Sequence, residues 1–272
     1  MIEHRVDRTL IQPMECRCLR RLGSLHDGGY VVPAEAISRA CVLLSFGVAT
    51  NWTFERAAVE MNPQLSVEAY DPSVGKARFV SLGLRAAVSA PLRLAGLNPR
   101  GALASLRKLH ASADYFRFFS GRRRHYRERV WHNRDRGSAS VSDAIERSGA
   151  KRPLSVFAKI DIEGAEYRIL PGVCDHAELF AGLVVEFHDT DICADTFNAQ
   201  LMRLRDAFEV VHVHGNNYGD LSFDKSLPLS LEITLMNRGL FSSPPVPYTG
   251  PLPRPGLDWP NDPRMPDYVI RL

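Results

Sequence analysis

The chain has 272 residues, 45% of them hydrophobic and 24% charged, with a formal net charge of +3, a composition typical of globular proteins with a full core. Its longest apolar runs are far shorter than the roughly 20 residues that span a bilayer, and its N-terminal residues lack the apolar core of a signal peptide, so we expect a cytoplasmic protein with no membrane span. Five cysteines at scattered positions exclude a disulfide framework and a Cys-x-x-Cys zinc pair.

The first part of the chain predicts two strands separated by a glycine turn and a helix. The predicted elements are a lead-in over 1–40, a buried strand over 41–46, a helix over 52–60 and a strand over 65–70. Gly47 ends the first strand. Pro72 cannot donate a hydrogen bond to a sheet, so the second strand stops before it and leaves Asp71 at its carboxyl end.

A basic segment follows between Arg100 and Arg136. It contains eleven Arg and Lys residues and three Asp and Glu residues, so its net charge is +8 and the rest of the chain carries about −5. Aromatic side chains lie among these charges, at Tyr115, Phe116, Phe118, Phe119, Tyr126 and Trp131. Such a composition is not typical of a disordered tail, and we predict one or two helices inserted between strands over 100–137.

Strands and helices alternate again after Ser138. Helices are predicted over 141–148, 165–170 and 195–208, and strands over 155–160, 182–187, 209–214 and 229–236. Repeated strand and helix units predict a parallel sheet in a single α/β domain over 1–272. The Pro-rich segment 242–272 is expected to run along the surface and to end in a strand-like stretch over 268–272.

The stretch 157–166 leads an apolar strand into three carboxylates, Asp161, Glu163 and Glu166, around Gly164. Ligands bind outside the carboxyl ends of the strands in open α/β sheets, so Asp161 and Glu163 are expected to face a ligand. The alternative is an exposed strand end whose acids cap the next helix, because a helix N-terminus favours negative charge.

A strand, a glycine turn, a helix, a strand and an acid form the skeleton of a nucleoside-binding unit, in which Asp71 would hold the ribose hydroxyls. The dinucleotide fingerprint is broken, because Ala49 and Trp52 stand where its second and third glycines are needed. S-adenosylmethionine contains adenosine but no phosphate, and we predict it as the cofactor in preference to NAD. In the alternative interpretation, Gly47 only ends a strand and Asp71 only caps a helix.

Three segments resemble the FkbM-type S-adenosylmethionine-dependent methyltransferases, many of which methylate hydroxyls of sugars and polyketide-derived compounds. Residues 159–166 (Lys-Ile-Asp-Ile-Glu-Gly-Ala-Glu) are similar to the family's KIDVEGAE signature. Residues 45–48 and 52–55 are similar to its cofactor segment. Shorter similarities occur at 27–30, 185–188, 212–217 and 259–263, whereas Ala49 and Thr50 depart from the Gly or Asn that the family often has.

The resemblance implies a Rossmann-like class I methyltransferase fold, with a mostly parallel central sheet, helices on both faces and a basic helical insertion. It also implies a cofactor site for S-adenosylmethionine. The residues expected to bind the cofactor are Tyr30, Ser45, Phe46, Gly47, Val48, Asp71 and Asp161.

Methylation of a hydroxyl requires a base, because the sulfonium is already a good leaving group and the enzyme mainly positions the reactants and removes a proton. Candidate groups at successive strand ends are Asp161 and Glu163, then Glu186 and His188, then His212 and His214. We predict His188 as the base, with Asp161 orienting it or the acceptor, and His214 as the alternative. Two other interpretations stay open: His212 and His214 as a pair satisfied inside the core, or two histidines and a carboxylate holding a divalent metal.

The basic segment fits an anionic acceptor, such as a phosphorylated, nucleotide-linked or lipid-pyrophosphate-linked sugar, because arginine matches phosphate oxygens. We therefore expect O-methylation of a small molecule or glycan. A solvated helix face would also explain the charge. A nucleic acid partner ranks lower, because the basic residues are confined to one segment and the Asn-Pro-Pro-Tyr motif of base amino-group methylation is missing. A non-catalytic binding protein, and homo-oligomers formed through the aromatic insertion or the Pro-rich tail, also stay open.

Overall fold

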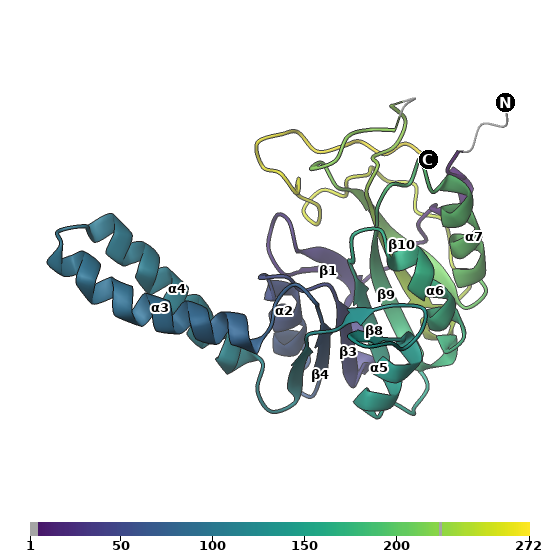
Figure 1. The fold of residues 1–272 in the computed structure, drawn as a ribbon. Coiled ribbons are helices and arrows are strands. Elements are labelled where there is room, and N and C mark those ends of the chain that lie inside the picture. Colours follow the sequence, from purple (N-terminus) through teal and green to yellow (C-terminus); the bar gives the residue numbers. More distant parts are fainter. Residues whose placement is uncertain (1–4, 223–224) are drawn as a thin grey trace.

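The computed structural model describes residues 5–222 and 225–272. Within these residues, seven strands form a central sheet (Figure 1). In spatial order the strands are β10 (Phe208–Gly215), β11 (Leu231–Asn237), β9 (Phe180–Phe187), β8 (Val156–Ile160), β3 (Val42–Phe46), β4 (Ser66–Tyr70) and β5 (Arg123–Tyr126). The strand β11 is antiparallel to both neighbours, and the pairs among the other strands are parallel.

The remaining elements cover the sheet or extend from it. The helices are α1 (Ala34–Arg39), α2 (Thr53–Met61), α3 (Lys76–Ala95), α4 (Pro99–Phe118), α5 (Val141–Ser148), α6 (Glu166–Cys174) and α7 (Ala194–Leu204). Short 3-10 turns lie at Arg8–Leu10, Ala177–Leu179 and Arg238–Leu240. The strands β1 (Leu19–Leu22) and β2 (Tyr30–Pro33) form an antiparallel pair, and β6 (Arg129–Val130) and β7 (Ser138–Ala139) form a parallel pair.

Helices pack on both faces of the sheet because its strands are apolar on both sides. On β3, Leu44 and Phe46 belong to a buried cluster with side chains of α5, α6 and α7. Leu43, between them, points to the opposite face and belongs to a second cluster with side chains of α1, α2 and β2. Alternation of side chains along a strand therefore gives each layer of helices its own core.

The strand order fits a Rossmann-like class I methyltransferase fold: β4 and β5 follow β3 on one side, β8 and β9 lie on the other, and the reversed β11 is inserted between β9 and β10. The predicted fold, with its mostly parallel sheet and helices on both faces, is confirmed. Strand order reverses between β3 and β8, and the crevice outside the carboxyl ends of these strands is where such sheets bind ligands.

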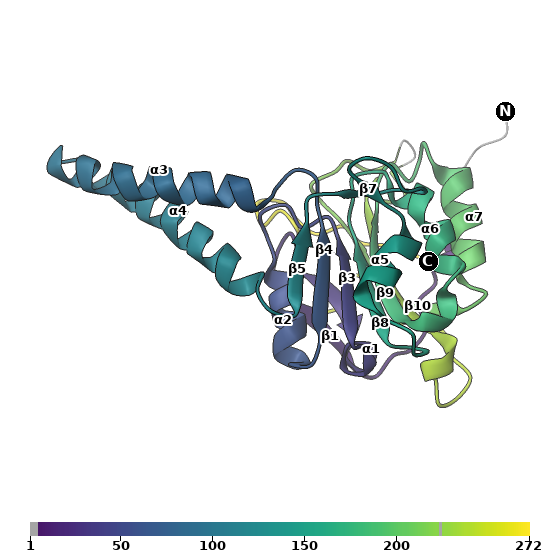
Figure 2. The same ribbon diagram turned by 60° about the horizontal axis from the view of Figure 1, so that its bottom comes forward.

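The basic insertion differs from its prediction. The connection between β4 and β5 is a long helical hairpin of α3 and α4, which projects from the sheet (Figures 1 and 2). It therefore begins before the predicted boundary at Arg100. The second half of the predicted insertion is not helical, because β5 pairs with β4 at the edge of the sheet, where its charged side chains remain accessible to solvent.

Three other predicted boundaries were wrong. The helix α6 continues through Pro171 instead of ending before it, because proline removes one hydrogen bond but its carbonyl still accepts from Asp175 N at 3.0 Å. The helix α7 ends at Leu204, and Phe208 already belongs to β10. The expected C-terminal strand is reduced to one bridge between Leu252 and Ile270.

The Pro-rich segment is fixed by buried polar contacts with the antiparallel strands. His212 Nε2 of β10 lies 3.0 Å from Asp258, and Asn261 Nδ2 donates to Glu232 of β11 at 2.7 Å. The segment is thereby anchored beside the carboxyl end of β10. In the described ranges, no helix is both long enough and apolar enough to cross a bilayer.

Candidate functional site

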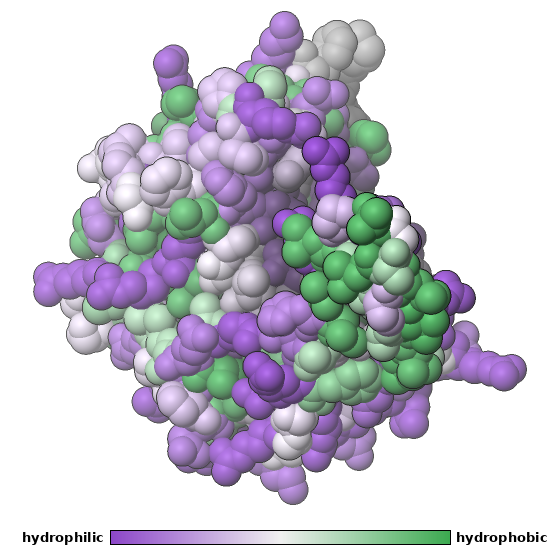
Figure 3. All heavy atoms as spheres, turned by 90° about the vertical axis from the view of Figure 1, so that its left-hand side faces the viewer, coloured by the Kyte–Doolittle hydropathy of each residue, from purple (hydrophilic) through white to green (hydrophobic). Residues whose placement is uncertain are grey.

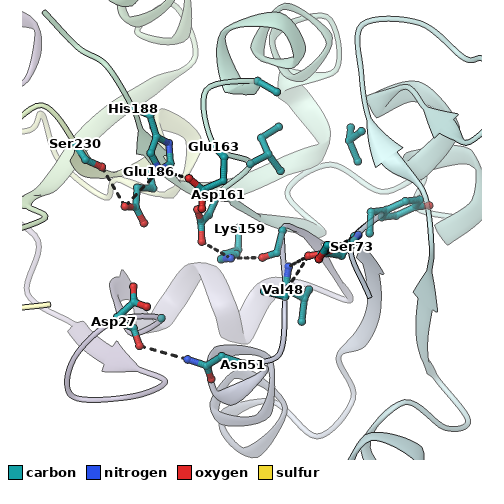
Figure 4. A pocket seen from close by; sticks show the side chains of 18 of the residues that line it. Asp27, Val48, Asn51, Ser73, Lys159, Asp161, Glu163, Glu186, His188 and Ser230 are labelled. Carbon is teal, nitrogen blue, oxygen red and sulfur yellow. Dashed lines mark hydrogen bonds and ion pairs between the residues drawn. The ribbon is translucent and has the colours of Figure 1, made fainter. Parts of the chain in front are cut away.

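A cavity of about 800 Å³ lies at the carboxyl ends of β3, β4, β8 and β9 (Figure 4). Six of the predicted site residues line it: Gly47, Val48, Asp71, Asp161, Glu163 and His188. These residues come from the ends of four strands, so the sheet edge brings them together although they are far apart in the sequence. The cavity is large enough for a nucleoside-sized ligand with part of a second molecule.

Gly47 forms the sharp turn at the end of β3. Its φ is +80°, and a β-carbon at this position would lie 1.6 Å from the backbone oxygen of Asp161. Only glycine fits both the left-handed backbone and this close approach. The turn therefore holds the ends of β3 and β8 against each other on the floor of the cavity.

Asp71 fixes the same turn from the end of β4. Its Oδ2 accepts from the backbone N–H of Val48 at 3.0 Å and of Ala49 at 2.6 Å, and its Oδ1 accepts from Ser73 N and Oγ at 2.7 and 2.5 Å. Burial opposes ionisation, but the hydrogen bonds from Ser73, Ala49 and Val48 outweigh it and lower the pKa of Asp71. These four donors occupy the lone pairs of the carboxylate, so a ribose hydroxyl would have to replace one of them.

Lys159 of β8 links the glycine turn to the acids. Its ammonium group is buried, donates to the backbone oxygen of Gly47 and lies 3.0 Å from Asp161 Oδ2. Burial disfavours the charge, but the carboxylates of Asp161 and Glu55 outweigh it and raise the pKa of Lys159. Lys159 was not among the predicted site residues, although a lysine inside an otherwise apolar strand was a visible signal for a buried ion pair.

Tyr30 joins two carboxyl groups behind the cavity wall. Its hydroxyl lies 3.0 Å from Asp161 Oδ2 and 3.1 Å from Glu186 Oε2. Tyr30 has one hydroxyl proton for two carboxyl groups, which favours protonation of one of them. Burial, Asp161 and Glu232 raise the pKa of Glu186 to about 8, whereas Lys159 helps to hold that of Asp161 low against its burial. Glu186 is therefore the protonated member at neutral pH.

The other oxygen of Glu186 is also satisfied. Its Oε1 accepts from Asn216 Nδ2 at 2.7 Å and from Ser230 Oγ at 3.0 Å. A neutral carboxyl group in this position donates to Tyr30, which in turn donates to the ionised Asp161. The three residues form a hydrogen-bonded chain in which Tyr30 joins two carboxyl groups that both line the cavity.

His188 lies beside this chain, at the end of β9, and is held by Glu166. Glu166 Oε1 accepts from the backbone N–H of His188 at 2.7 Å, and His188 Nδ1 lies 3.2 Å from the same oxygen. Burial opposes protonation of the imidazole, but the hydrogen bond and charge of Glu166, together with the charge of Asp161, act in the opposite direction, and the pKa of His188 is raised to about 9. His188 is therefore an imidazolium at neutral pH, and it would act as a base only after losing a proton.

Asp161, Glu186 and His188 each offer one potential metal-ligating atom, and these atoms lie within 4.8 Å of one another (Figure 4). Two oxygens and one imidazole nitrogen suit a divalent cation. This group differs from the predicted metal site, which had two histidines and a carboxylate. His212 and His214 instead contact Asp258 and Asp267 of the C-terminal segment.

Four predicted site residues are not among the described residues that line the cavity. Tyr30 lies one layer behind it, Ser45 is buried with its Oγ 2.5 Å from Glu55, and Phe46 packs edge-on against Tyr70. These three support the cavity from within. The fourth is His214, which is buried on β10 with Nδ1 3.1 Å from Glu232 and Nε2 3.0 Å from Asp267. With a carboxylate at each ring nitrogen, His214 is an imidazolium that donates from both nitrogens and anchors the C-terminal segment. Such an imidazolium has no free nitrogen to accept a proton from a substrate.

Arg129 and Trp131 of the basic segment also line the cavity. The Trp131 ring lies 5.1 Å from the Arg129 guanidinium and 5.0 Å from that of Arg168. Such contacts hold the indole in place and make it a platform on which a ring can stack. Two side chains of the predicted basic segment therefore lie at the cavity.

No family model matches the chain, and no curated protein is significantly similar to it in sequence. Solved structures show distant similarity. The fibrillarin/Nop5p complex has 12% identity over 72% of each chain with a TM-score of 0.35. A precorrin-6y C5,15-methyltransferase from Geobacter metallireducens has 12% identity over 75% of this chain and 85% of its own with a TM-score of 0.34, and a predicted O-methyltransferase from Agrobacterium tumefaciens has 10% identity over 75% and 80% with a TM-score of 0.33. Similarities this weak do not identify an activity, and the fold rests on the strand order.

Proposed function

We propose that this protein is an S-adenosylmethionine-dependent O-methyltransferase acting on a hydroxyl of a sugar or related small molecule, in an anionic or carrier-linked form. The observation that supports it best is one cavity in which the turn at Gly47, fixed by Asp71, lies near the cluster of Asp161, Glu186 and His188. The turn suits an adenosine-containing donor, and the cluster suits removal of a proton from an acceptor.

The same cavity is poorly suited to a pyrophosphate. Trp52 stands at the start of α2, where a dinucleotide site needs a glycine, and its indole packs among Phe79, Tyr115 and Phe119. Trp52 Nε1 donates to Asp114 at 3.0 Å, so the ring is fixed in this position. This favours a nucleoside without phosphates over NAD.

The FkbM-type assignment remains part of the proposal on the resemblance of residues 159–166, which also have defined contacts in this structure. Lys159 holds the glycine turn, and Asp161 accepts from Tyr30. Gly164 has φ of +92° and donates its N–H to Glu166, which in turn fixes His188. Four positions of the signature-like segment therefore have defined contacts at the cavity.

Bound S-adenosylmethionine would supply an electrophilic methyl group on a positively charged sulfur. The chain's own residues would position the acceptor and take its proton. We assign that proton to His188 Nε2, which lies 3.7 Å from Glu186 and 3.6 Å from Glu163 and belongs to a residue lining the cavity. Arg129 and Trp131 would bind the anionic group and the ring of the acceptor.

A divalent cation at Asp161, Glu186 and His188 is the alternative to His188 as the base, because a ring nitrogen that binds a cation cannot also accept a proton. It would displace the protons of Glu186 and His188 and would acidify a hydroxyl bound to it. The test is activity after exhaustive chelation and after re-addition of Mg²⁺ or Mn²⁺. Full activity of the chelated protein would remove the metal and leave His188 as the base.

Calorimetric titration with S-adenosylhomocysteine, beside NAD, tests the proposed donor site. We expect micromolar binding of S-adenosylhomocysteine, no binding of NAD, and a loss of at least about tenfold in Asp71→Ala, because the turn loses its charged hydrogen-bond partner. Asp175→Ala is the matched control, since Asp175 is exposed and lies 2.5 Å from Arg203, outside the cavity lining. No binding by the folded wild-type protein would refute the methyl-donor proposal.

A further inference from the structure

The hairpin of α3 and α4 projects away from the sheet and the cavity (Figures 1 and 2). Each helix has 20 residues, so the hairpin extends about 30 Å at 1.5 Å per residue. It is much longer than the connection from β4 to β5 needs. The hairpin therefore presents a large surface whose composition indicates what it contacts.

The two helices meet through small residues. The buried positions that face the partner helix include Gly83, Ala86 and Ala90 on α3, and Ala102, Ser105 and Ser112 on α4. A β-carbon on Gly83 would lie 2.6 Å from Ser112 Oγ, so the helices approach closely. Hydroxyl groups add polar contacts between them, with Ser89 Oγ 2.8 Å from Ser105 Oγ. Small residues and serine hydroxyls between helices are typical of helix pairs in lipid.

The large apolar side chains of the hairpin point outwards. On α3, Val80, Leu84, Val88 and Leu92 follow one another at intervals of four residues and are 46–67% exposed. Leu94 is 57% exposed, and Leu97 in the connection is 89% exposed. Further exposed apolar side chains on α4 are Leu103, Leu106, Leu109 and Phe116. Figure 3, seen from the side to which the hairpin projects, shows apolar side chains gathered over it. An exposed apolar surface of this extent marks an interaction site.

The charge of the hairpin indicates which kind of partner its apolar surface fits. From Lys76 to Ala113 the sequence has seven Lys and Arg residues and no Asp or Glu: Lys76, Arg78, Arg85, Arg93, Arg100, Arg107 and Lys108. All seven are exposed. A second copy of the hairpin would bring an equal positive charge against this surface, which disfavours self-association. An anionic lipid surface offers both a negative charge for the basic residues and an apolar layer for the leucines.

We propose that the hairpin docks this protein on an anionic lipid bilayer, with the leucines near its end entering the boundary between headgroups and acyl chains and the Lys and Arg residues contacting lipid phosphates. The docking is peripheral, since neither helix is apolar enough to cross a bilayer. It follows from the hairpin alone and does not depend on the methyl-transfer proposal.

The test is co-sedimentation of the full chain with vesicles of phosphatidylcholine, with and without phosphatidylglycerol. We expect binding to the anionic vesicles only, weakened by added salt. In Leu94→Ser/Leu97→Ser the affinity should fall by at least about tenfold, because two leucines no longer transfer from water. Ile192→Ser is the matched control, since Ile192 is 83% exposed at the start of the α7 region and should leave binding unchanged.

The variants change exposed side chains, so the thermal unfolding of the protein should not change, and this is measured first. A second variant, Arg100→Glu/Arg107→Glu, should also reduce binding to anionic vesicles at least about tenfold. Absence of binding to phosphatidylglycerol vesicles at low salt would overturn the proposal. So would a stable dimer that Leu94→Ser/Leu97→Ser dissociates, or binding of RNA in place of vesicles by the same basic residues.

Discussion

The ammonium group of Lys159, near the end of β8, lies 3.0 Å from Oδ2 of Asp161, the residue that follows this strand. Lys159 also donates to the backbone oxygen of Gly47, so one buried cation holds the glycine turn and keeps Asp161 ionised. Asp161 in turn accepts from Tyr30. The turn on one side of the cavity and the acid cluster on the other are therefore coupled through a single side chain.

Lys159→Met should destabilise the protein by about 3–5 kcal/mol, because it leaves Asp161 buried without its cation. Urea unfolding measures this change. The matched control is Lys151→Met, which removes an exposed lysine just after α5 and should change stability very little. Equal stability of Lys159→Met and Lys151→Met would show that the ion pair contributes nothing.

Gly47→Ala should destabilise the protein by more than about 3 kcal/mol and abolish binding of S-adenosylhomocysteine, because its β-carbon would overlap the backbone of Asp161. Gly164→Ala is the control, because it introduces backbone strain without this overlap. Gly164 also has a positive φ, but none of the described atoms lies within 4 Å of a β-carbon built there. Its substitution should cost only about 1–2 kcal/mol, as measured by urea unfolding.

Glu186→Gln should be tolerated at pH 7, because an amide resembles the protonated carboxyl group and can still donate to Tyr30. Asp161→Asn should be far more damaging, since it leaves Lys159 without its ionised partner. We expect unfolding free energies within about 1 kcal/mol of wild type for the first variant and a loss of about 3 kcal/mol or more for the second. If the two variants are equally damaging, Glu186 is not the protonated member of the pair.

His188→Ala should lower turnover by roughly 10²–10⁴-fold while S-adenosylhomocysteine still binds, because a general base is lost without a change at the glycine turn. The wild-type rate should rise with pH up to about 9, the pKa of His188, since only the deprotonated imidazole accepts a proton. Near-normal turnover of His188→Ala, with any acceptor that the wild type methylates, would exclude this role.

The raised pKa of His214 should make the free energy of unfolding depend on pH. Burial lowers its pKa, but hydrogen bonds to Asp267 and Glu232 outweigh this and raise the pKa to about 10, whereas an unfolded histidine titrates near about 6.5. The folded protein therefore holds the extra proton. The stabilisation is complete below about pH 6.5 and is lost as the pH rises through about 10.

Thermal unfolding across this pH range checks the prediction. His214→Gln should be less stable than wild type at pH 6.5 and should lose the part of the pH dependence that comes from His214. His110→Gln is the control, because His110 is exposed on α4 and its substitution should preserve the slope. An unchanged slope in His214→Gln would contradict the assignment of the proton to His214.

The sequence by itself determined most of the strands and the fold class. Buried strands such as β3 and β8 are largely apolar, with Lys159 as the charged exception in β8, and acids directly follow β4 and β8 at Asp71 and Asp161. These are local patterns, and they indicate which residues of a strand are buried and where it ends, whatever its position in the sheet. They were sufficient to predict the cavity edge on which Gly47, Asp71, Asp161 and His188 meet.

The helix α3 escaped prediction because its small residues face its partner and its leucines face outwards, the reverse of the usual pattern of a helix that packs on a core. The position of His214 outside the cavity lining was also not visible in the sequence. Its partner Asp267 is 53 residues away in the chain, so no local pattern links them.

Only the tertiary structure decided the protonation of the site. Tyr30 contacts Asp161 across 131 residues of sequence and Glu186 across 156 residues. A pKa depends on burial and on the charges within a few ångströms, and these are set by which strands become neighbours in the sheet. The sequence therefore identified the groups at the strand ends, and the order of the strands determined which of them share a proton.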